Sequence, residues 1–211
     1  MTVTAAGPVE QADPSSDGGT GDVAVSRRSA WWVLIAGVIG LASALTLTIE
    51  KIEILIDPSY IPSCSLNPVL SCGSVMTTPQ ASVFGFPNSL IGIIAFTVVL
   101  VTGVLAVARI DLPRWYWAGL AIGTGLGVVF VHWLIFQSLY RIGALCPYCM
   151  VVWAVTVPLL VIVTSIALRA DTGTGVLGAV YQWRWSLVAL WFTAVLLMIL
   201  VRFWNYWSTL V

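Results

Sequence analysis

The hydrophobic positions of the chain fall into five long apolar stretches separated by polar segments. Stretches of this length with few charged residues inside predict membrane-spanning α-helices. The polar segments carry the Pro, Gly and charged residues that punctuate such helices. The five predicted spans are residues 30–49, 88–108, 116–139, 146–168 and about 185–201. The pattern therefore predicts an all-α, polytopic membrane protein with five transmembrane helices.

Three regions follow from this pattern. Residues 1–28 are rich in Pro, Gly, Ser and Asp, which predicts a disordered cytoplasmic tail. Residues 29–169 hold the first four spans and a polar extramembrane loop at 50–87, and residues 170–211 form a linker and the fifth span. The first span also resembles a cleavable export signal, but its apolar run continues to full spanning length, which favours a retained helix.

The composition agrees with a membrane protein. Hydrophobic residues make up 59% of the 211 residues and charged residues only 9%, whereas a soluble domain carries about a quarter charged residues. Most of the 11 tryptophans lie near the ends of the predicted spans, as in the aromatic belts of membrane proteins. The net charge is zero and no basic stripe occurs, which argues against nucleic acid as a partner.

The basic residues predict the orientation, because cytoplasmic segments of membrane proteins are enriched in Lys and Arg. With the N-terminus in the cytoplasm, six basic residues fall inside: Arg27, Arg28, Arg109, Arg114, Arg169 and Arg184. Three fall outside: Lys51, Arg141 and Arg202. This orientation places the 50–87 loop, the start of the fourth span and the C-terminus on the extracytoplasmic face.

A Cys-Pro-Tyr-Cys motif at 146–149 opens the fourth span. Unpaired N–H groups and the helix dipole favour a thiolate at a helix N-terminus, and proline suits the first helical turn. The pair can therefore cycle between dithiol and disulfide. Such a pair is also half of a zinc site, but Cys64, Cys72 and the single His132 make a poor set of further ligands. We therefore favour redox chemistry and expect no metal.

Cys64 and Cys72 lie in the 50–87 loop, on the same predicted face as the 146–149 motif. Two cysteine pairs on one face can exchange disulfides through a mixed-disulfide intermediate. The sequence has no haem, flavin or iron–sulfur motif, so a diffusible membrane quinone is the natural acceptor of the two electrons. The alternative is a pair of static disulfides that brace the loop, as is common outside the cytosol.

Three segments carry a family resemblance: SCGSVM at 71–76, VFGFPNSL at 83–90 and LYRIGALCPYC at 139–149. They resemble the vitamin K epoxide reductase family in its bacterial branch, and the resemblance covers about residues 30–168. It implies a four-helix bundle around a quinone, capped by the outer loop. The implied activity is oxidation of a thioredoxin-like partner, with electrons delivered to a membrane quinone, which drives disulfide bond formation.

The resemblance also implies a role for each cysteine. Cys64 and Cys72 match the loop cysteines of the family, which shuttle between the partner and the bundle. Cys64 would face the partner, and Cys72 would form a transient bridge to Cys146. Cys149 matches the cysteine next to the quinone, which is released as a thiolate when that bridge forms.

Three further residues are implied to contact the quinone. Asn88 matches an asparagine that donates a hydrogen bond to a quinone oxygen. Trp153 stands where the animal enzymes carry a tyrosine, and an indole can donate a hydrogen bond but not accept one. Thr78 lies near a small hydroxyl position of the family pattern. His132, in the third span, is interpreted as a packed or hydrogen-bonded side chain rather than a proton carrier.

Many bacterial relatives continue past a fifth helix into a fused thioredoxin-like domain, so for this chain we expect a separate thioredoxin-like thiol oxidoreductase on the outer side. Two other functions compete with this one. An outward conduit of reductant would need a cysteine on the inner side, and no predicted inner segment has one. A membrane scaffold with structural disulfides would need no electron acceptor. The quinone itself, menaquinone or ubiquinone, is left open.

Overall fold

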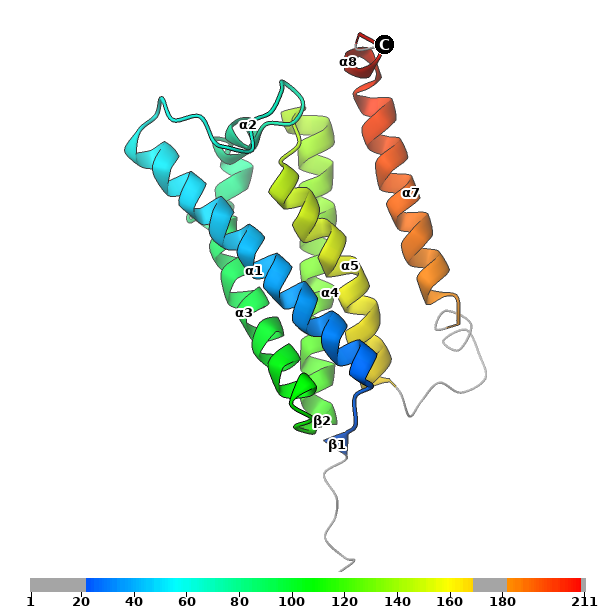
Figure 1. Cartoon of the computed structure of the whole chain (residues 1–211). Helices are drawn as coiled ribbons and strands as arrows, with labels where there is room; N and C mark the ends of the chain where they lie inside the picture. Colours follow the sequence, from blue (N-terminus) through cyan, green and yellow to red (C-terminus); the bar gives the residue numbers. More distant parts are fainter. Residues whose placement is uncertain (1–21, 169–181, 210–211) are drawn as a thin grey trace, which may run out of the picture.

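A computed structural model describes residues 22–168 and 182–209. Four long helices form a bundle, and a fifth, α7, stands along one side of it (Figure 1). The bounds are α1 Arg27–Ile56, α3 Asn88–Val107, α4 Arg114–Phe136, α5 Pro147–Ala167 and α7 Arg184–Arg202. Within the described ranges, five helices, with α4 continued to Ile142, are long and apolar enough to cross a membrane. The predicted all-α, polytopic fold class is therefore confirmed.

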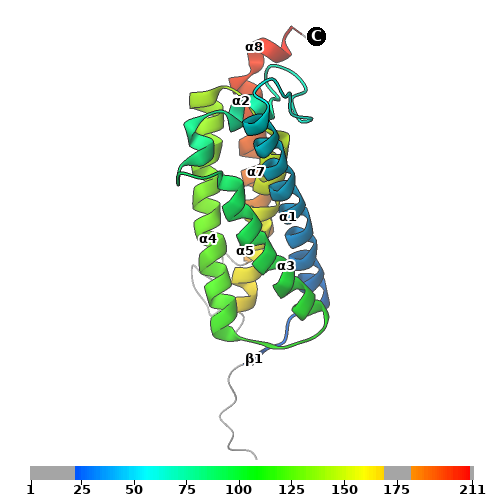
Figure 2. The ribbon, with the colours of Figure 1, turned by 90° about the vertical axis from the view of Figure 1, so that its left-hand side faces the viewer.

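At one end of the bundle, a two-residue strand β1 (Asp22–Val23) pairs antiparallel with β2 (Leu112–Pro113). Figure 2 shows this end opposite the end that carries α2. The strand lies inside the segment expected to be a disordered tail, so the ordered chain begins earlier than expected. Strand β1 is ordered because β2, in the turn between α3 and α4, pairs with it. Composition alone does not reveal such a partner. Residues 1–21 lie outside the described residues.

The other end of the bundle carries four short elements. Two lie in the loop between α1 and α3, and a π-helical segment, η3, continues α4. The bounds are α2 Cys72–Met76, η2 Pro79–Ser82, η3 Gln137–Ile142 and α8 Trp204–Trp207. The loop therefore folds over this end of the bundle, as expected from the sequence.

Helix α1 continues to Ile56, two turns beyond the apolar run predicted at 30–49. The charged residues that mark the end of that run do not interrupt helical hydrogen bonding. The helix ends only before Pro58, because a residue that precedes proline disfavours the helical conformation. The last turns of α1 therefore project into the region expected to be loop, and Glu50 is a helical residue.

The bundle is held together most closely between α1 and α3. A Cβ atom added at Gly37 would lie 2.7 Å from the Cα atom of Leu100, and one added at Gly103 would lie 2.5 Å from that of Leu34. Small residues let membrane helices approach to this distance. α1 also packs on α5, and α4 packs on α5, whereas α3 and α4 make few direct contacts. Space is therefore left between α3 and α4.

Two polar contacts attach α7 to the bundle. Trp191 Nε1 donates a hydrogen bond to His132 Nε2 at 2.8 Å, and His132 Nδ1 lies 2.8 Å from the carbonyl oxygen of Val128. Near the cysteine end, Arg202 Nε donates to the carbonyl oxygen of Leu139 at 2.8 Å. His132 therefore uses both ring nitrogens in hydrogen bonds, which agrees with its interpretation from the sequence. The linker residues 169–181 lie outside the described residues.

Exchange of His132 for leucine, or of Trp191 for phenylalanine, is expected to loosen α7. Each change should lower the free energy of unfolding by about 0.5–1 kcal/mol, since hydrogen bonds between membrane helices average about 0.6 kcal/mol. The double variant should lose less than the sum of the two single changes. Unfolding of all four proteins in mild detergent measures this coupling, and strictly additive losses would mean that the bond contributes nothing.

Candidate active site

Three sulfur atoms meet at one end of the bundle. Cys64 and Cys72 form a disulfide, and the free thiol of Cys146 places its Sγ atom 3.1 Å from Sγ of Cys72. All three side chains are buried. Cys149, also free, lies one turn further along α5 and packs against this cluster. A thiol in contact with a disulfide sulfur is the arrangement from which disulfide exchange begins.

A short backbone pairing sets this contact. Leu145 N donates to the carbonyl oxygen of Val69 at 2.7 Å, and Ser71 N donates to the carbonyl oxygen of Leu145 at 2.9 Å. Leu145 and Leu70 thereby form an isolated parallel bridge. Ser71 and Leu145 each immediately precede a cysteine of the cluster, so the bridge aligns the loop with the start of α5. Gly143, with φ of 72°, provides the left-handed turn that leads from η3 into this bridge.

Cys146 occupies the N-cap of α5, and Pro147 follows in the first turn. The Sγ atom of Cys146 accepts a hydrogen bond from the backbone N–H of Cys149 at 3.4 Å. The hydrogen bond with the Cys149 thiol, helped by the backbone N–H groups of Cys149 and Tyr148, holds the pKa of Cys146 below its ordinary value. Burial and the negative charge of Glu50 oppose this effect. Cys146 therefore reaches the thiolate form, the form that attacks a disulfide, more readily than an ordinary thiol does.

The thiol of Cys146 is expected to deprotonate at a lower pH than an ordinary thiol, whose pKa is about 8.5. Because the Cys149 thiol is the largest cause of the lowered pKa, Cys149→Ala should raise the pKa of Cys146. With the Cys64–Cys72 disulfide intact, only two thiols titrate. Thiolate absorbance in the ultraviolet, followed against pH, measures the pKa of Cys146 in wild type and in Cys149→Ala. Cys146→Ser serves as the reference. An unchanged midpoint in Cys149→Ala would contradict the assignment.

A cavity of about 540 Å³ lies between α3, α4 and α5, with α1 behind it. Its volume is typical of a site for a small organic ligand, and most of its lining side chains are apolar. Gly119 and Gly123 of α4 line it, and a Cβ atom added at either would meet nothing within 4 Å. Cys149 lies on its wall. The same thiol therefore borders both the sulfur cluster and the cavity.

Asn88, the first residue of α3, also lines the cavity. Its Nδ2 donates to the carbonyl oxygen of Gln80 at 2.7 Å, and its Oδ1 accepts from Val83 N at 3.2 Å. The side chain thus fastens the 80–83 segment to the start of α3. An amide nitrogen carries two hydrogens, so one donor remains for a molecule in the cavity.

The other two residues expected near a quinone are placed differently. Trp153 lines the cavity, but its Nε1 is buried and has no hydrogen-bond partner among the described residues. In this conformation the indole serves as an apolar wall, because a fully covered N–H does not face the cavity. Thr78 does not line the large cavity. Its hydroxyl donates to the carbonyl oxygen of Val75 at 2.7 Å, and it borders a smaller space of about 80 Å³ beside Asn88 and Cys149.

Ser89 and Tyr116 are among the polar residues of the cavity wall that were not identified from the sequence. The hydroxyl of Ser89 lies 2.8 Å from that of Thr48, and the hydroxyl of Tyr116 lies 2.6 Å from that of Thr102. Ser89 and Tyr116 line the cavity at its two ends. Ser89 follows Asn88 in the VFGFPNSL motif at 83–90. Its place in that motif was the signal that could have identified it. For Tyr116 no signal existed, since an aromatic residue at the start of a span is typical of the interfacial belt.

The donor set does not suit a metal ion in this form. Cys64, Cys72 and Cys146 bring their sulfur atoms within 4.8 Å of one another. Metal ions bind thiolates, however, and two of these sulfur atoms are joined in a disulfide. The arrangement fits exchange between sulfur atoms instead.

Comparison with known proteins agrees with this chemistry. No match to the chain was found among curated proteins. A family model described as the vitamin K epoxide reductase family matches residues 31–164, a range that includes most of the four bundle helices and all four cysteines. The chain therefore belongs to the vitamin K epoxide reductase family, whose members are membrane oxidoreductases that couple thiol–disulfide chemistry to a quinone.

Proposed function

We propose that this protein oxidises the thiols of a separate, extracytoplasmic thioredoxin-like protein and delivers the two electrons to a membrane quinone. The observation that carries the proposal is the free Cys146 thiol 3.1 Å from the Cys72 sulfur of a disulfide, beside a cavity that Cys149 lines. One arrangement thus offers a disulfide for a partner to reduce, a second pair to receive the electrons, and an apolar space next to that second pair.

The proposed relay begins at the loop. A thiolate of the partner attacks Cys64, and the second partner thiol completes the partner's own disulfide, which leaves Cys64 and Cys72 reduced. The Cys72 thiolate then attacks Cys146 of an oxidised Cys146–Cys149 pair, and Cys149 leaves as a thiolate. Cys64 attacks Cys72, which restores the loop disulfide and frees Cys146. Two electrons and two protons have then moved from the partner to the second pair.

A quinone accepts these two electrons and two protons and becomes a quinol. The apolar cavity suits its ring and tail, because it is large enough for a ligand of this class. Asn88 provides a hydrogen-bond donor, and a fixed donor stabilises negative charge that develops on an oxygen. Cys149 borders the cavity and re-forms its disulfide with Cys146 as the electrons leave. Trp153 and Thr78 would shape the site as wall and loop contact.

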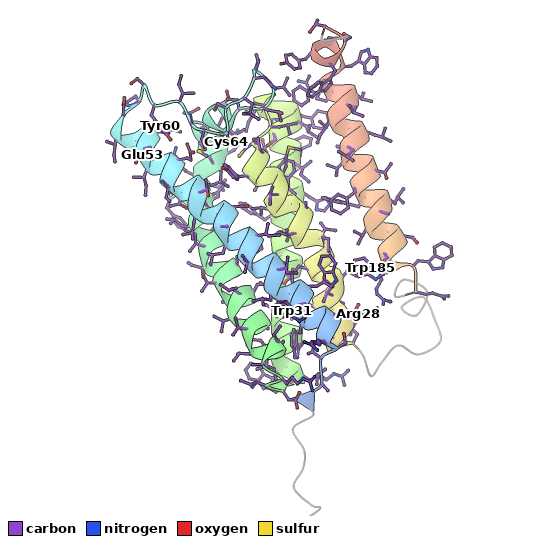
Figure 3. The ribbon with its side chains drawn as sticks, in the orientation of Figure 1. Arg28, Trp31, Glu53, Tyr60, Cys64 and Trp185 are labelled. Carbon is purple, nitrogen blue, oxygen red and sulfur yellow. A yellow bond between two sulfur atoms is a disulfide. The ribbon has the colours of Figure 1, made fainter. Side chains whose placement is uncertain are left out.

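We infer that the cysteine end faces away from the cytoplasm. Figure 3 shows Cys64, Glu53 and Tyr60 at one end of the bundle and Arg28 at the other. Six of the nine basic residues fall in segments that this orientation places inside, in agreement with the positive-inside rule. The N-terminus would then be cytoplasmic, and the end of α7 would lie on the same side as the cysteines.

Two other functions fit less well. A scaffold with static disulfides has no need of a free thiol against a disulfide sulfur, which is what Cys146 provides. An outward conduit of reductant needs a cysteine at the other end of the bundle, and all four cysteines of the chain lie at one end.

The direct test is quinone absorbance during turnover of the purified protein with a reduced thioredoxin-like protein. Wild type should convert quinone to quinol, and Cys64→Ala should not, because the loop disulfide that the partner reduces can no longer form. Ser74→Ala, a neighbouring loop change that keeps all four cysteines, should behave as wild type. If quinone stays oxidised with wild type and the loop disulfide resists the partner, the scaffold function is the better account.

A further inference from the structure

Glu50 is a buried carboxylate beside the sulfur cluster. Its side chain is 6% exposed, and among the side chains described in residues 23–168 and 182–209 no other acidic or basic one is buried. It lies on α1, one turn after Leu47, which belongs to the same buried cluster as Cys64, Cys72 and Cys146. A buried carboxylate is costly unless hydrogen bonds compensate it. The carboxylate of Glu50 therefore needs hydrogen-bond donors around it.

Ser63, the residue before Cys64, provides these donors. Both the backbone N–H and the hydroxyl of Ser63 donate to the carboxylate of Glu50, the N–H at 3.2 Å to Oε2. Hydrogen bonds to a charged group are the stronger kind in proteins. Glu50 thus fixes the backbone immediately before Cys64 to the rigid end of α1.

A second hydrogen bond near Cys64 runs from the backbone N–H of Gly73 to the hydroxyl of Ser65 at 3.3 Å. Cys64 lies between exposed residues on both sides, with Ile61 at 76% and Leu66 at 69% exposure. Its covalent tie to Cys72 disappears whenever the loop disulfide opens. On the other side of the cluster, Lys51 Nζ donates to the carbonyl oxygen of Met76 at 2.7 Å, which holds the end of α2. Adjacent residues of α1 therefore anchor the two halves of the loop separately.

We propose that Glu50 is a positioning residue that, through Ser63, keeps Cys64 within reach of Cys72 while the loop disulfide is open. This inference rests on the proposed function. It concerns the step in which the Cys64 thiolate attacks Cys72 of the Cys72–Cys146 disulfide. The Cys64–Cys72 bond forms, the Cys72–Cys146 bond breaks, and Cys146 leaves with the electron pair. One thiol proton is lost at Cys64 and one can be gained at Cys146, so no external oxidant is needed.

The test isolates this step in a Cys149→Ala background, where three cysteines share one disulfide. The Cys64–Cys72 and Cys72–Cys146 forms then interconvert without partner or quinone, and acid quenching, alkylation and mass spectrometry give their ratio. Glu50→Ala should shift this ratio toward Cys72–Cys146 by about tenfold, the size expected for loss of hydrogen bonds to a charged group. Glu53→Ala removes an exposed carboxylate three residues further along α1 and should leave the ratio unchanged.

Two more variants separate positioning from charge or from a general loss of structure. Glu50→Gln keeps an acceptor oxygen for Ser63 and should restore much of the wild-type ratio, and Ser63→Ala should shift it less than Glu50→Ala. An unchanged ratio in Glu50→Ala overturns the proposal, and so does a Gln variant as impaired as the Ala variant. If Glu50→Ala does not fold, the Gln and Ser63 variants still decide. Failure of wild type to reduce quinone would instead overturn the proposed function, since the ratio requires no quinone.

Discussion

Cys149→Ala is expected to abolish quinone reduction and to raise the fraction of protein that carries a Cys72–Cys146 disulfide. Cys149 borders the cavity, and Cys146 touches the sulfur of Cys72. Without Cys149 the second pair cannot form its own disulfide, so electrons that reach Cys146 have no path to the cavity. Turnover should fall by about three orders of magnitude or more, as when a reacting group is removed from an enzyme.

The measurement has two readouts on the same sample. Quinone absorbance reports turnover, and non-reducing mass spectrometry after alkylation reports which cysteines are joined. Met150→Leu is a matched control, because it changes the next residue of α5 and keeps every sulfur atom of the relay. If Cys149→Ala retains turnover, or if Cys72 never joins Cys146, the order of cysteines in the relay is wrong.

The fold was largely predictable from the sequence because long apolar runs are a strong signal for spanning helices. The ends of the helices were less predictable. Hydropathy places the end of the first span at residue 49, whereas α1 continues to Ile56. Glu50 looks like the start of a solvated loop in the sequence, yet it is buried. Its hydrogen-bond partner, Ser63, lies 13 residues away, and hydropathy carries no information about such a pairing.

The candidate site was likewise predictable only in part. The four cysteines and Asn88 could be found from motifs, since their spacing is local. The bridge between Leu70 and Leu145 depends on the register between a loop and a helix start that are far apart in the sequence. The covered N–H of Trp153 depends on rotamer and packing. A motif therefore identifies the reacting atoms, but not the contacts that align them.

Asn88→Ala is expected to lower kcat for quinone reduction by about a hundredfold, the usual effect of removing a donor that stabilises developing negative charge. The change would also release the 80–83 segment, because Asn88 bonds to Gln80 and Val83. Asn88→Asp removes the amide donor, and with it the bond to Gln80, but keeps the other loop contact. It keeps the acceptor for Val83 N and replaces the amide donor with a negative charge, so it should impair quinone reduction at least as strongly.

Steady-state kinetics with varied quinone and varied partner checks this expectation. The loss should appear in kcat and in kcat/KM for quinone, whereas exchange between Cys72 and Cys146 in single turnover without quinone should stay near the wild-type rate. Gln80→Ala is the loop control, since the backbone carbonyl that accepts from Asn88 remains. If Asn88→Asp reduces quinone as fast as wild type, Asn88 holds the loop and does not act on the quinone. The fixed donor at the cavity would then have to come from another polar side chain of its wall, where Ser89, Tyr116, Thr124 and Thr156 carry hydroxyl groups.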